Sequence, residues 1–257
     1  MVGAINENNP TAQVGSVYVY DKIANIWQLT DKLTPSDGQF SDTFGYSVSL
    51  FGDRALVGAR QKNDTINSIN GAGAAYIYDF DANTNLWIET KLQNPNPSHN
   101  GLFGGSVNLE NDRAIIGAIG GRGQNNISTG TATIFDYDSA SDMWNSTTLF
   151  ASDGSTQDNF GISVSLAGDR ALIGAYQDDD GDTNSGAAYQ FDFDGSNWIE
   201  TKKHLASDGA KADLYGFSVS LSGDNALIGV YQDDDGGTDS GSVYTFNVEF
   251  VFSDGFE

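Results

Sequence analysis

The sequence predicts an all-β fold in which one four-stranded antiparallel sheet is repeated along the chain. Three kinds of residue recur at intervals of 54 to 60 positions: an aromatic residue followed by glycine, a tryptophan, and a glycine that precedes a run of β-branched and aromatic residues. No segment shows a sustained helical period. Self-similarity of this length is typical of a propeller or repeat array, in which each unit is one supersecondary element.

The recurring residues are spread evenly over the chain. The aromatic–glycine pairs are Phe44-Gly45, Phe103-Gly104, Phe160-Gly161 and Tyr215-Gly216, the tryptophans are Trp27, Trp87, Trp144 and Trp198, and the single glycines are Gly15, Gly73, Gly130, Gly186 and Gly241. Buried aromatic side chains dominate core energetics. We therefore expect the aromatic–glycine pairs and the tryptophans to pack between neighbouring sheets.

One unit is represented by residues 44–93. A tight turn containing glycine separates the first two strands, and a polar loop separates the second from the third. The four expected strands are residues 46–50, 54–57, 74–78 and 86–92. Four short antiparallel strands in each repeated unit indicate a β-propeller. A β-sandwich is the alternative, but it would not require such close repetition.

We expect one propeller domain over residues 1–248, followed by a C-terminal tail, 249–257. The expected units are residues 1–43, 44–102, 103–159, 160–214 and 215–248. The first unit lacks its aromatic–glycine strand and the last lacks a clear tryptophan strand, so both end units are incomplete, with three strands each. The chain is then either a fragment of a longer propeller, which we favour because repeat arrays need protected ends, or a five-bladed ring. An incomplete ring would expose strand edges, and we expect self-association in that case.

The units resemble FG-GAP repeats, the modules of the integrin α-chain propeller and of many bacterial secreted proteins. The matching Gly-Ala pairs are Gly58-Ala59, Gly117-Ala118 and Gly174-Ala175, with Gly229-Val230 as a weaker copy. The resemblance covers nearly the whole chain and implies an extracellular or cell-surface protein. Many members of the family bind calcium at the first hairpin. Here that hairpin offers only single acids such as Asp53 or Asp169, so calcium is not carried over to it.

Two acidic loops between the second and third strands of the last two units are the candidate calcium sites. Oxygen atoms at alternate positions of a tight loop can converge on one hard cation. The candidate ligands are Asp178, Asp180, Asp182 and Asn184 in the first loop and Asp233, Asp235 and Asp239 in the second. The alternative is a solvated loop of turn-forming residues. Because the loops at 60–71 and 119–129 lack the acidic triplet, we expect any ion to be confined to the last two units.

A second recurrence precedes three of the aromatic–glycine pairs: Ser-Asp-Gly, followed four residues later by aspartate. It occupies residues 36–42, 152–158 and 207–213, and the loop at 94–102 breaks the pattern. Ser-Asp-Gly is a common turn, so we interpret this recurrence as turn chemistry.

Composition excludes several functional classes. The 35 acidic residues against 12 basic ones give a formal net charge of -23, which argues against binding to nucleic acid or anionic membranes. No apolar run is long enough to be inserted in a membrane, and the absence of cysteine excludes disulfides and thiolate metal sites. Two histidines, His99 and His204, lie in different units outside any catalytic motif, and we expect both at the surface.

We therefore expect a non-enzymatic extracellular binding or adhesion module that presents its polar acidic loops to a protein or glycan, with calcium as the candidate cofactor. No signal peptide opens the chain, and the start inside an expected second strand suggests a truncated N-terminus. One alternative is a hydrolase or lyase acting on polysaccharide, which would need acids together with His or Tyr in a central pocket. Another is a structural spacer within a larger surface protein.

The calcium hypothesis predicts that millimolar calcium, added after excess EDTA, raises the melting midpoint of the purified chain. A ligand that binds only the folded state stabilises it by mass action. Superimposable melting curves would contradict the hypothesis and leave the acidic loops as turns that keep the protein in solution.

Overall fold

The computed structural model describes residues 1–8, 12–123 and 126–248, and the expected tail, 249–257, lies outside the described residues. Within these ranges the chain is all-β, with 18 strands in five antiparallel sheets and no α-helix. The sheets contain three, four, four, four and three strands in chain order, as the sequence pattern predicted. We call them blades 1 to 5.

The strands follow one another along the chain as a series of meanders. Blade 1 contains β1 (Val2–Ala4), β2 (Ser16–Ile23) and β3 (Ile26–Leu33). Blade 2 contains β4 (Phe44–Phe51), β5 (Arg54–Ala59), β6 (Ala74–Asp81) and β7 (Leu86–Leu92). Blade 3 contains β8 (Ser106–Glu110), β9 (Arg113–Ala118), β10 (Thr131–Asp138) and β11 (Met143–Leu149). Blade 4 contains β12 (Val164–Ala167), β13 (Arg170–Ala175), β14 (Ala187–Phe193) and β15 (Trp198–His204). Blade 5 contains β16 (Tyr215–Ser222), β17 (Asn225–Val230) and β18 (Ser242–Asn247).

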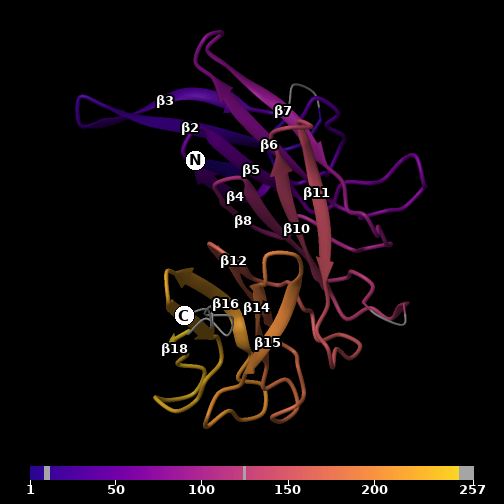
Figure 1. The fold of residues 1–257 in the computed structure, drawn as a ribbon, viewed down its shortest axis with the longest axis vertical. Helices are drawn as coiled ribbons and strands as arrows, with labels where there is room; N and C mark the ends of the chain where they lie inside the picture. The colour runs from indigo at the N-terminus through magenta and orange to yellow at the C-terminus, as the bar shows by residue number, and fades with distance from the viewer. Residues whose placement is uncertain (9–11, 124–125, 249–257) are drawn as a thin grey trace.

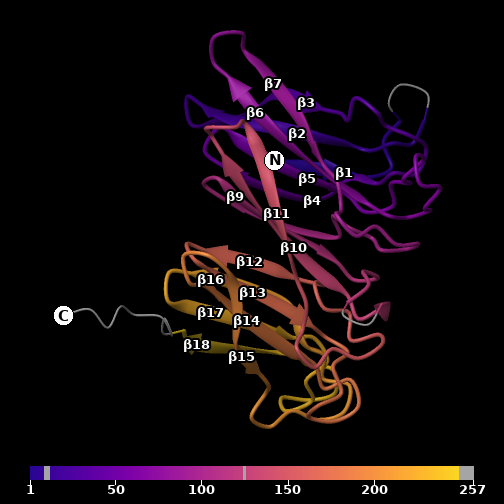
Figure 2. The same ribbon diagram turned by 45° about the vertical axis from the view of Figure 1, so that its right-hand side comes forward.

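The blades form an open array (Figures 1 and 2). In both views blade 1, in indigo, lies in the upper half of the molecule beside blade 2, and blade 5, in yellow, lies in the lower half beside blade 4. Within the described residues, every strand ladder joins strands of the same blade, so the first and last sheets are not paired. We call the side of a blade that is turned toward the next blade in the chain its downstream face, and the opposite side its upstream face.

Neighbouring blades are joined by the aromatic–glycine pair of the later blade. In blade 2 the pairing of β4 with β5 is interrupted by a bulge between Phe44 and Ser47, which spans Gly45 at a φ of 85°. A bulge re-aims the backbone locally. Phe44 thereby forms a parallel bridge with Gly15 of blade 1. The equivalent bridges join Gly73 to Phe103, Gly130 to Phe160 and Gly186 to Tyr215.

The hydrophobic core is divided into four layers, one between each pair of neighbouring blades. The aromatic residue of each pair is fully buried in one of these layers, as predicted. Its ring packs edge-on against an aromatic side chain of the third strand in its own blade; for example, the ring centroids of Phe44 and Tyr76 are 5.5 Å apart. Such edge-to-face geometry adds to the free energy gained from burial alone.

The tryptophans behave differently from one another. Trp198 is buried and Trp87 and Trp144 are partly buried, but Trp27 is 67% exposed. The expectation that all four pack between sheets is therefore wrong for Trp27. In blades 3 and 4 an arginine of the preceding blade lies over the ring of the tryptophan, Arg54 over Trp144 and Arg113 over Trp198. No blade among the described residues precedes blade 1, so Trp27 has no such cover.

A recurring arginine, whose role was not predicted from the sequence, supplies a second link between blades. The Arg54 guanidinium pairs with Asp79 of its own blade at 2.5 Å and with Asp112 of blade 3 at 2.7 Å, and it lies over the ring of Trp144. Arg113 and Arg170 occupy the same position in blades 3 and 4. The Asp-Arg pair after each first hairpin turn was the available sequence signal, and in blade 5 the arginine is replaced by Asn225.

No helix among the described residues is long and apolar enough to span a membrane.

Replacement of Phe103 by alanine should lower the free energy of unfolding by about 3–5 kcal/mol, because it leaves a cavity between blades 2 and 3. Urea denaturation at neutral pH measures this change. Phe40, 67% exposed, is the matched control, and its replacement by alanine should have an effect within about 0.5 kcal/mol. Equal effects of the two substitutions would contradict the view that the aromatic–glycine pair holds the blades together.

Candidate functional site

The candidate site residues lie along one edge of the blades, which we call the loop edge. Antiparallel pairing places the end of the second strand beside the starts of the first and third strands, as the pairing of Ala59 with Phe44 and with Ala74 shows in blade 2. The loops after the second strands and the segments before the first strands therefore meet at the same edge. Both predicted acidic loops belong to this edge.

In blade 4 the acidic loop surrounds a lysine. The Lys203 Nζ atom lies 2.9 Å from a carboxylate oxygen of Asp178, 2.6 Å from one of Asp180 and 2.8 Å from one of Asp153. Burial by itself would lower the pKa of Lys203, but hydrogen bonds to the three aspartates outweigh this effect and raise the pKa. The ammonium group thus lies where the negative charges of the loop converge.

The other two predicted ligands in this loop make different contacts. An Asp182 carboxylate oxygen accepts the Thr183 N–H at 2.6 Å, and the Asn184 N–H donates to Asp179 at 2.7 Å. These are the local side-chain-to-backbone bonds of turn-forming residues. The structure thus brings Asp178 and Asp180 together around Lys203, whereas the contacts of Asp182 and Asn184 hold the loop itself.

The acidic loop of blade 5 has no lysine partner among the described residues. Asp233 is buried and accepts the Asp235 N–H at 2.9 Å, while the Asp239 N–H donates to Asp234 at 2.7 Å. The negative charges of Asp233 and Asp208 raise the pKa of Asp235. Within the part of the chain that the structure describes, no basic side chain forms an ion pair with this loop, in contrast to its counterpart in blade 4.

No group of three or more His, Asp or Glu side chains is arranged to hold a metal ion within residues 1–8, 12–123 and 126–248. Calcium ligation by the seven candidate residues stays a prediction.

The Ser-Asp-Gly recurrence has a role beyond its turn. Its first aspartate lies within hydrogen-bonding distance of the third-strand tyrosine hydroxyl, and the pairs are Asp37 with Tyr76, Asp153 with Tyr189 and Asp208 with Tyr244. Its second aspartate accepts the N–H of the residue three positions earlier, and these acceptors are Asp42, Asp158 and Asp213. The motif therefore anchors the segment before each first strand to the third strand of the same blade.

The second aspartate of this motif has opposite neighbours in blades 2 and 4. Asp42 is buried and forms an ion pair with buried Lys62 at 2.8 Å. In blade 4 the position of Lys62 is taken by Asp178. Burial first, and then the charge of Asp178, raise the pKa of Asp158 to about 6, although a backbone hydrogen bond from Ser155 acts in the opposite direction.

The two histidines differ in exposure. His99 is exposed, as expected, whereas His204 is only 4% exposed, so the expectation of a surface position is wrong for His204. Its ring packs against Phe246 of blade 5 and lies 3.3 Å from the Gln190 side chain. Burial, with a smaller effect of the Lys202 charge, lowers the pKa of His204 to about 4. His204 ends β15 and contributes to the layer between blades 4 and 5.

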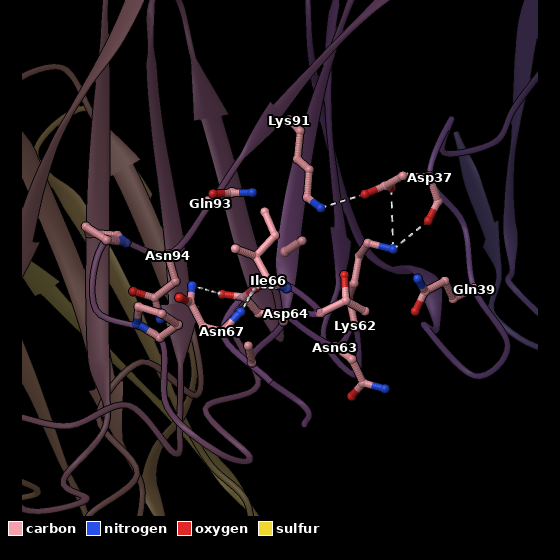
Figure 3. Close-up of a pocket in the computed structure, with 16 residues that line it drawn as sticks. Asp37, Gln39, Lys62, Asn63, Asp64, Ile66, Asn67, Lys91, Gln93 and Asn94 are labelled. Atoms are coloured by element: carbon pink, nitrogen blue, oxygen red, sulfur yellow. Dashed lines mark hydrogen bonds and ion pairs between the residues drawn. The ribbon is translucent and has the colours of Figure 1, made fainter. Parts of the chain in front are cut away.

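A pocket of about 610 Å³ opens at the loop edge of blade 2 (Figure 3). On one side, Lys62 and Lys91 both turn toward Asp37, with an Nζ to carboxylate distance of 2.6 Å for Lys91. On the other side, the Asn67 side chain donates to Asp64 at 2.7 Å. The amide side chains that line the pocket are Gln39, Asn63, Asn67, Gln93 and Asn94. The pocket is therefore rich in groups that can both donate and accept hydrogen bonds.

Asn94 differs from the other amides of the pocket in having a buried side-chain donor without a partner. It is 7% exposed, its Oδ1 accepts the Asn96 N–H at 2.9 Å, and its Nδ2 has no hydrogen-bond acceptor among the described residues. A buried donor without a partner costs free energy and in native proteins calls for an explanation. The pocket was not predicted from the sequence, although the break in the Ser-Asp-Gly pattern at residues 94–102 marked one of its walls.

Replacement of Asp158 by asparagine should stabilise the protein at pH 7 by about 1–3 kcal/mol, because the buried charge is removed while an oxygen acceptor remains. Folding raises the pKa of the Asp158 carboxyl from its ordinary value of 3.8 to about 6. Between these pH values the native state binds more protons than the unfolded state, so the stability of the unmodified protein falls as the pH rises from 3.8 to about 6. The stabilisation by Asp158→Asn should therefore vanish below pH 3.8. Urea denaturation at several pH values measures it.

Asp42→Asn is the matched control for this pH series. It should destabilise the protein at pH 7 by about 2–4 kcal/mol, because buried Lys62 loses its nearest carboxylate. If both substitutions changed the free energy of unfolding at pH 7 in the same direction, the result would contradict the opposite charge environments of Asp42 and Asp158.

Comparison with known protein families agrees with this geometry. Three stretches of the chain, residues 27–78, 144–191 and 198–246, match the FG-GAP repeat family. Each match ends in a third strand, β6, β14 or β18, and together the matches cover more than half of the chain. A search of curated proteins gives no match. Because the family matches cover more than half of the chain, and its aromatic–glycine strands join five antiparallel sheets in series, the chain belongs to the FG-GAP repeat family.

Proposed function

We propose that the protein is a non-enzymatic, extracellular binding module whose ligand occupies the pocket at the loop edge of blade 2. The observation that carries the proposal is the pocket itself, with the unsatisfied Asn94 donor in its wall. Its volume of about 610 Å³ lies within the range typical of small-molecule sites. A ligand acceptor at Asn94 Nδ2 would supply the hydrogen bond that the protein does not provide.

The lining favours a neutral, polyhydroxylated ligand such as an oligosaccharide. Side-chain amides both donate and accept, which matches sugar hydroxyl groups. The charged groups in the wall balance in number, two lysines (Lys62 and Lys91) against two aspartates (Asp37 and Asp64), and Asp37 pairs with both lysines. The formal net charge of -23 disfavours acidic polysaccharides at long range. Binding of a glycan on a cell or matrix surface would give the adhesive role expected of the chain.

A polysaccharide hydrolase or lyase and a structural spacer are the alternatives. An enzyme would release new sugar ends from a bound polysaccharide, whereas a binding module leaves the chain length unchanged. A spacer would bind no glycan at all. The same glycan preparations therefore separate all three functions.

We place calcium, as part of this proposal, in the loop of blade 5. There the charges of Asp208, Asp233 and Asp235 have no basic partner among the described residues, whereas in blade 4 the Lys203 ammonium already lies among the carboxylates of Asp153, Asp178 and Asp180. The calcium-dependent rise in melting midpoint should accordingly be lost in Asp235→Asn and kept in Asp180→Asn.

Glycan arrays probed with the 257-residue chain should identify neutral oligosaccharide ligands. Replacement of Gln93 or Asn67 by alanine should weaken binding of such a ligand roughly five-fold each, the effect of one lost hydrogen bond. Asn94→Asp, which keeps the acceptor atom and removes the donor, should weaken it roughly ten-fold or more. Isothermal titration calorimetry measures these changes.

Asn145→Ala is the matched control, since Asn145 is an exposed amide on β11, outside the pocket. It should leave the dissociation constant unchanged. Arrays without a bound neutral glycan, or unchanged binding by all three pocket variants, would rule out the proposed site.

A further inference from the structure

The downstream face of blade 5 is a copy of a surface that is covered everywhere else in the molecule. Blades 1 to 4 each receive the aromatic–glycine strand of the next blade through the parallel bridge at their recurring glycine. In blade 5 the corresponding glycine is Gly241, and no strand of the described chain bridges it. The four covered faces show what kind of structure this surface accepts.

Exposure at equivalent positions shows that the described residues leave this face uncovered. Leu227 is 46% exposed, whereas its counterparts Leu56, Ile115 and Leu172 are each 0% exposed. Val243 is 64% exposed, and its counterparts Ala75, Ala132 and Ala188 are likewise 0% exposed. These apolar side chains occupy core positions of the repeat without a neighbouring blade to cover them.

A hollow of about 320 Å³ lies where the missing strand would be seated. It is lined by residues that include Phe217, Ser218, Gly229, Gly241 and Val243. In blades 2 to 4 the equivalent of Gly229 lies against the next strand; a Cβ built on Gly58, for example, would come 2.1 Å from the Gly104 carbonyl oxygen. At Gly229 only Ser218 of the same blade comes as near, so the approach is open.

Two serine hydroxyl groups on this face occupy the positions that make polar contacts with the next strand on the covered faces. Ser47, Ser106 and Ser163 each donate at 2.8 Å to the glycine carbonyl of the next aromatic–glycine pair, and Ser218 is their counterpart. Ser49 and Ser165 each accept a hydrogen bond from a backbone N–H in the first strand of the next blade, and Ser220 is their counterpart in blade 5. In the described chain, Ser218 and Ser220 meet no such strand, so the face offers both apolar and hydrogen-bonding complementarity.

The arginine link is absent from this face. Arg54, Arg113 and Arg170 each approach an aspartate in the hairpin of the following blade, but Asn225 takes their place in blade 5. The face thus keeps the groups that seat a single strand and lacks the group that pairs with a following hairpin.

We propose that the downstream face of blade 5 is a docking site for one strand of a partner polypeptide that carries an aromatic–Gly–x–Ser sequence. A second copy of this chain is a poor donor, because all four of its aromatic–glycine strands are already seated in parallel bridges and its blade 1 lacks such a strand. The bound strand would place its aromatic ring on Val243 and its glycine carbonyl within reach of the Ser218 hydroxyl.

The probe is a fluorescent peptide with the sequence of residues 41–53, which contains Phe44, Gly45 and Ser47. Fluorescence anisotropy with the 257-residue chain should show saturable binding with one peptide per chain. Val243→Arg should weaken binding roughly ten-fold or more, because it buries an unpaired charge under the peptide. Ile26→Arg, at an aliphatic residue 63% exposed on blade 1, is the matched control and should bind the peptide normally.

A peptide with the Gly45→Val change tests the strand chemistry, since a side chain at this position would meet the backbone of the preceding blade. It should not bind. Failure of the unmodified peptide to bind, or equal binding to Val243→Arg, would overturn the proposal. Two further results would also overturn it. Self-association abolished by Val243→Arg, without peptide binding, would identify a second copy as the occupant. Peptide binding that requires removal of residues 249–257 would identify the chain's own tail.

Discussion

The structure depends on one repeated contact, the seating of an aromatic–glycine strand on the blade before it. The aromatic ring fills the layer between two sheets, and the glycine lets two backbones approach to a distance that a side chain would forbid. A Cβ on Gly161, for example, would lie 2.3 Å from the Thr131 carbonyl oxygen. Because each blade meets only its neighbours, stability is built from four such layers in place of one central core.

The same contact accounts for the exposed aromatic and aliphatic residues at the two ends. The position of Trp27 is more deeply buried in the blades that have a preceding blade. The position of Leu227 is more deeply buried in the blades that have a following blade. Neither side chain departs from the repeat in sequence. Their exposure follows from their place at the end of the array, and at blade 5 it leaves a surface with the shape and polar groups to receive another strand.

Function in this fold is concentrated where the repeat varies. The strands and the Asp–Tyr contacts of the loop edge recur from blade to blade, but the side chains around them change in charge. Lys62 in blade 2 corresponds to Asp178 in blade 4, and Lys203 in blade 4 has no counterpart among the described residues of blade 5. One backbone framework therefore holds a polar pocket, an acidic loop that surrounds a lysine, and an acidic loop that has no basic partner among the described residues.

The sequence by itself determined the fold class, the number of strands in each unit and the burial of the aromatic–glycine pairs. These features follow from local alternation, turn residues and a period of 54 to 60 positions, all of which can be read along the chain. It also located both acidic loops. It could not show that the Lys203 ammonium lies among the carboxylates of one loop, because these residues come from separate strands and segments.

The tertiary structure alone decided which charges are paired and which surfaces are covered. Asp42 and Asp158 occupy the same position of the same motif, yet one faces a lysine and the other an aspartate from the loop after the second strand. The pocket of blade 2 is likewise assembled from three segments, and the burial of His204 depends on blade 5. Periodicity specifies each unit, whereas charge neighbours and exposure depend on which units are packed together.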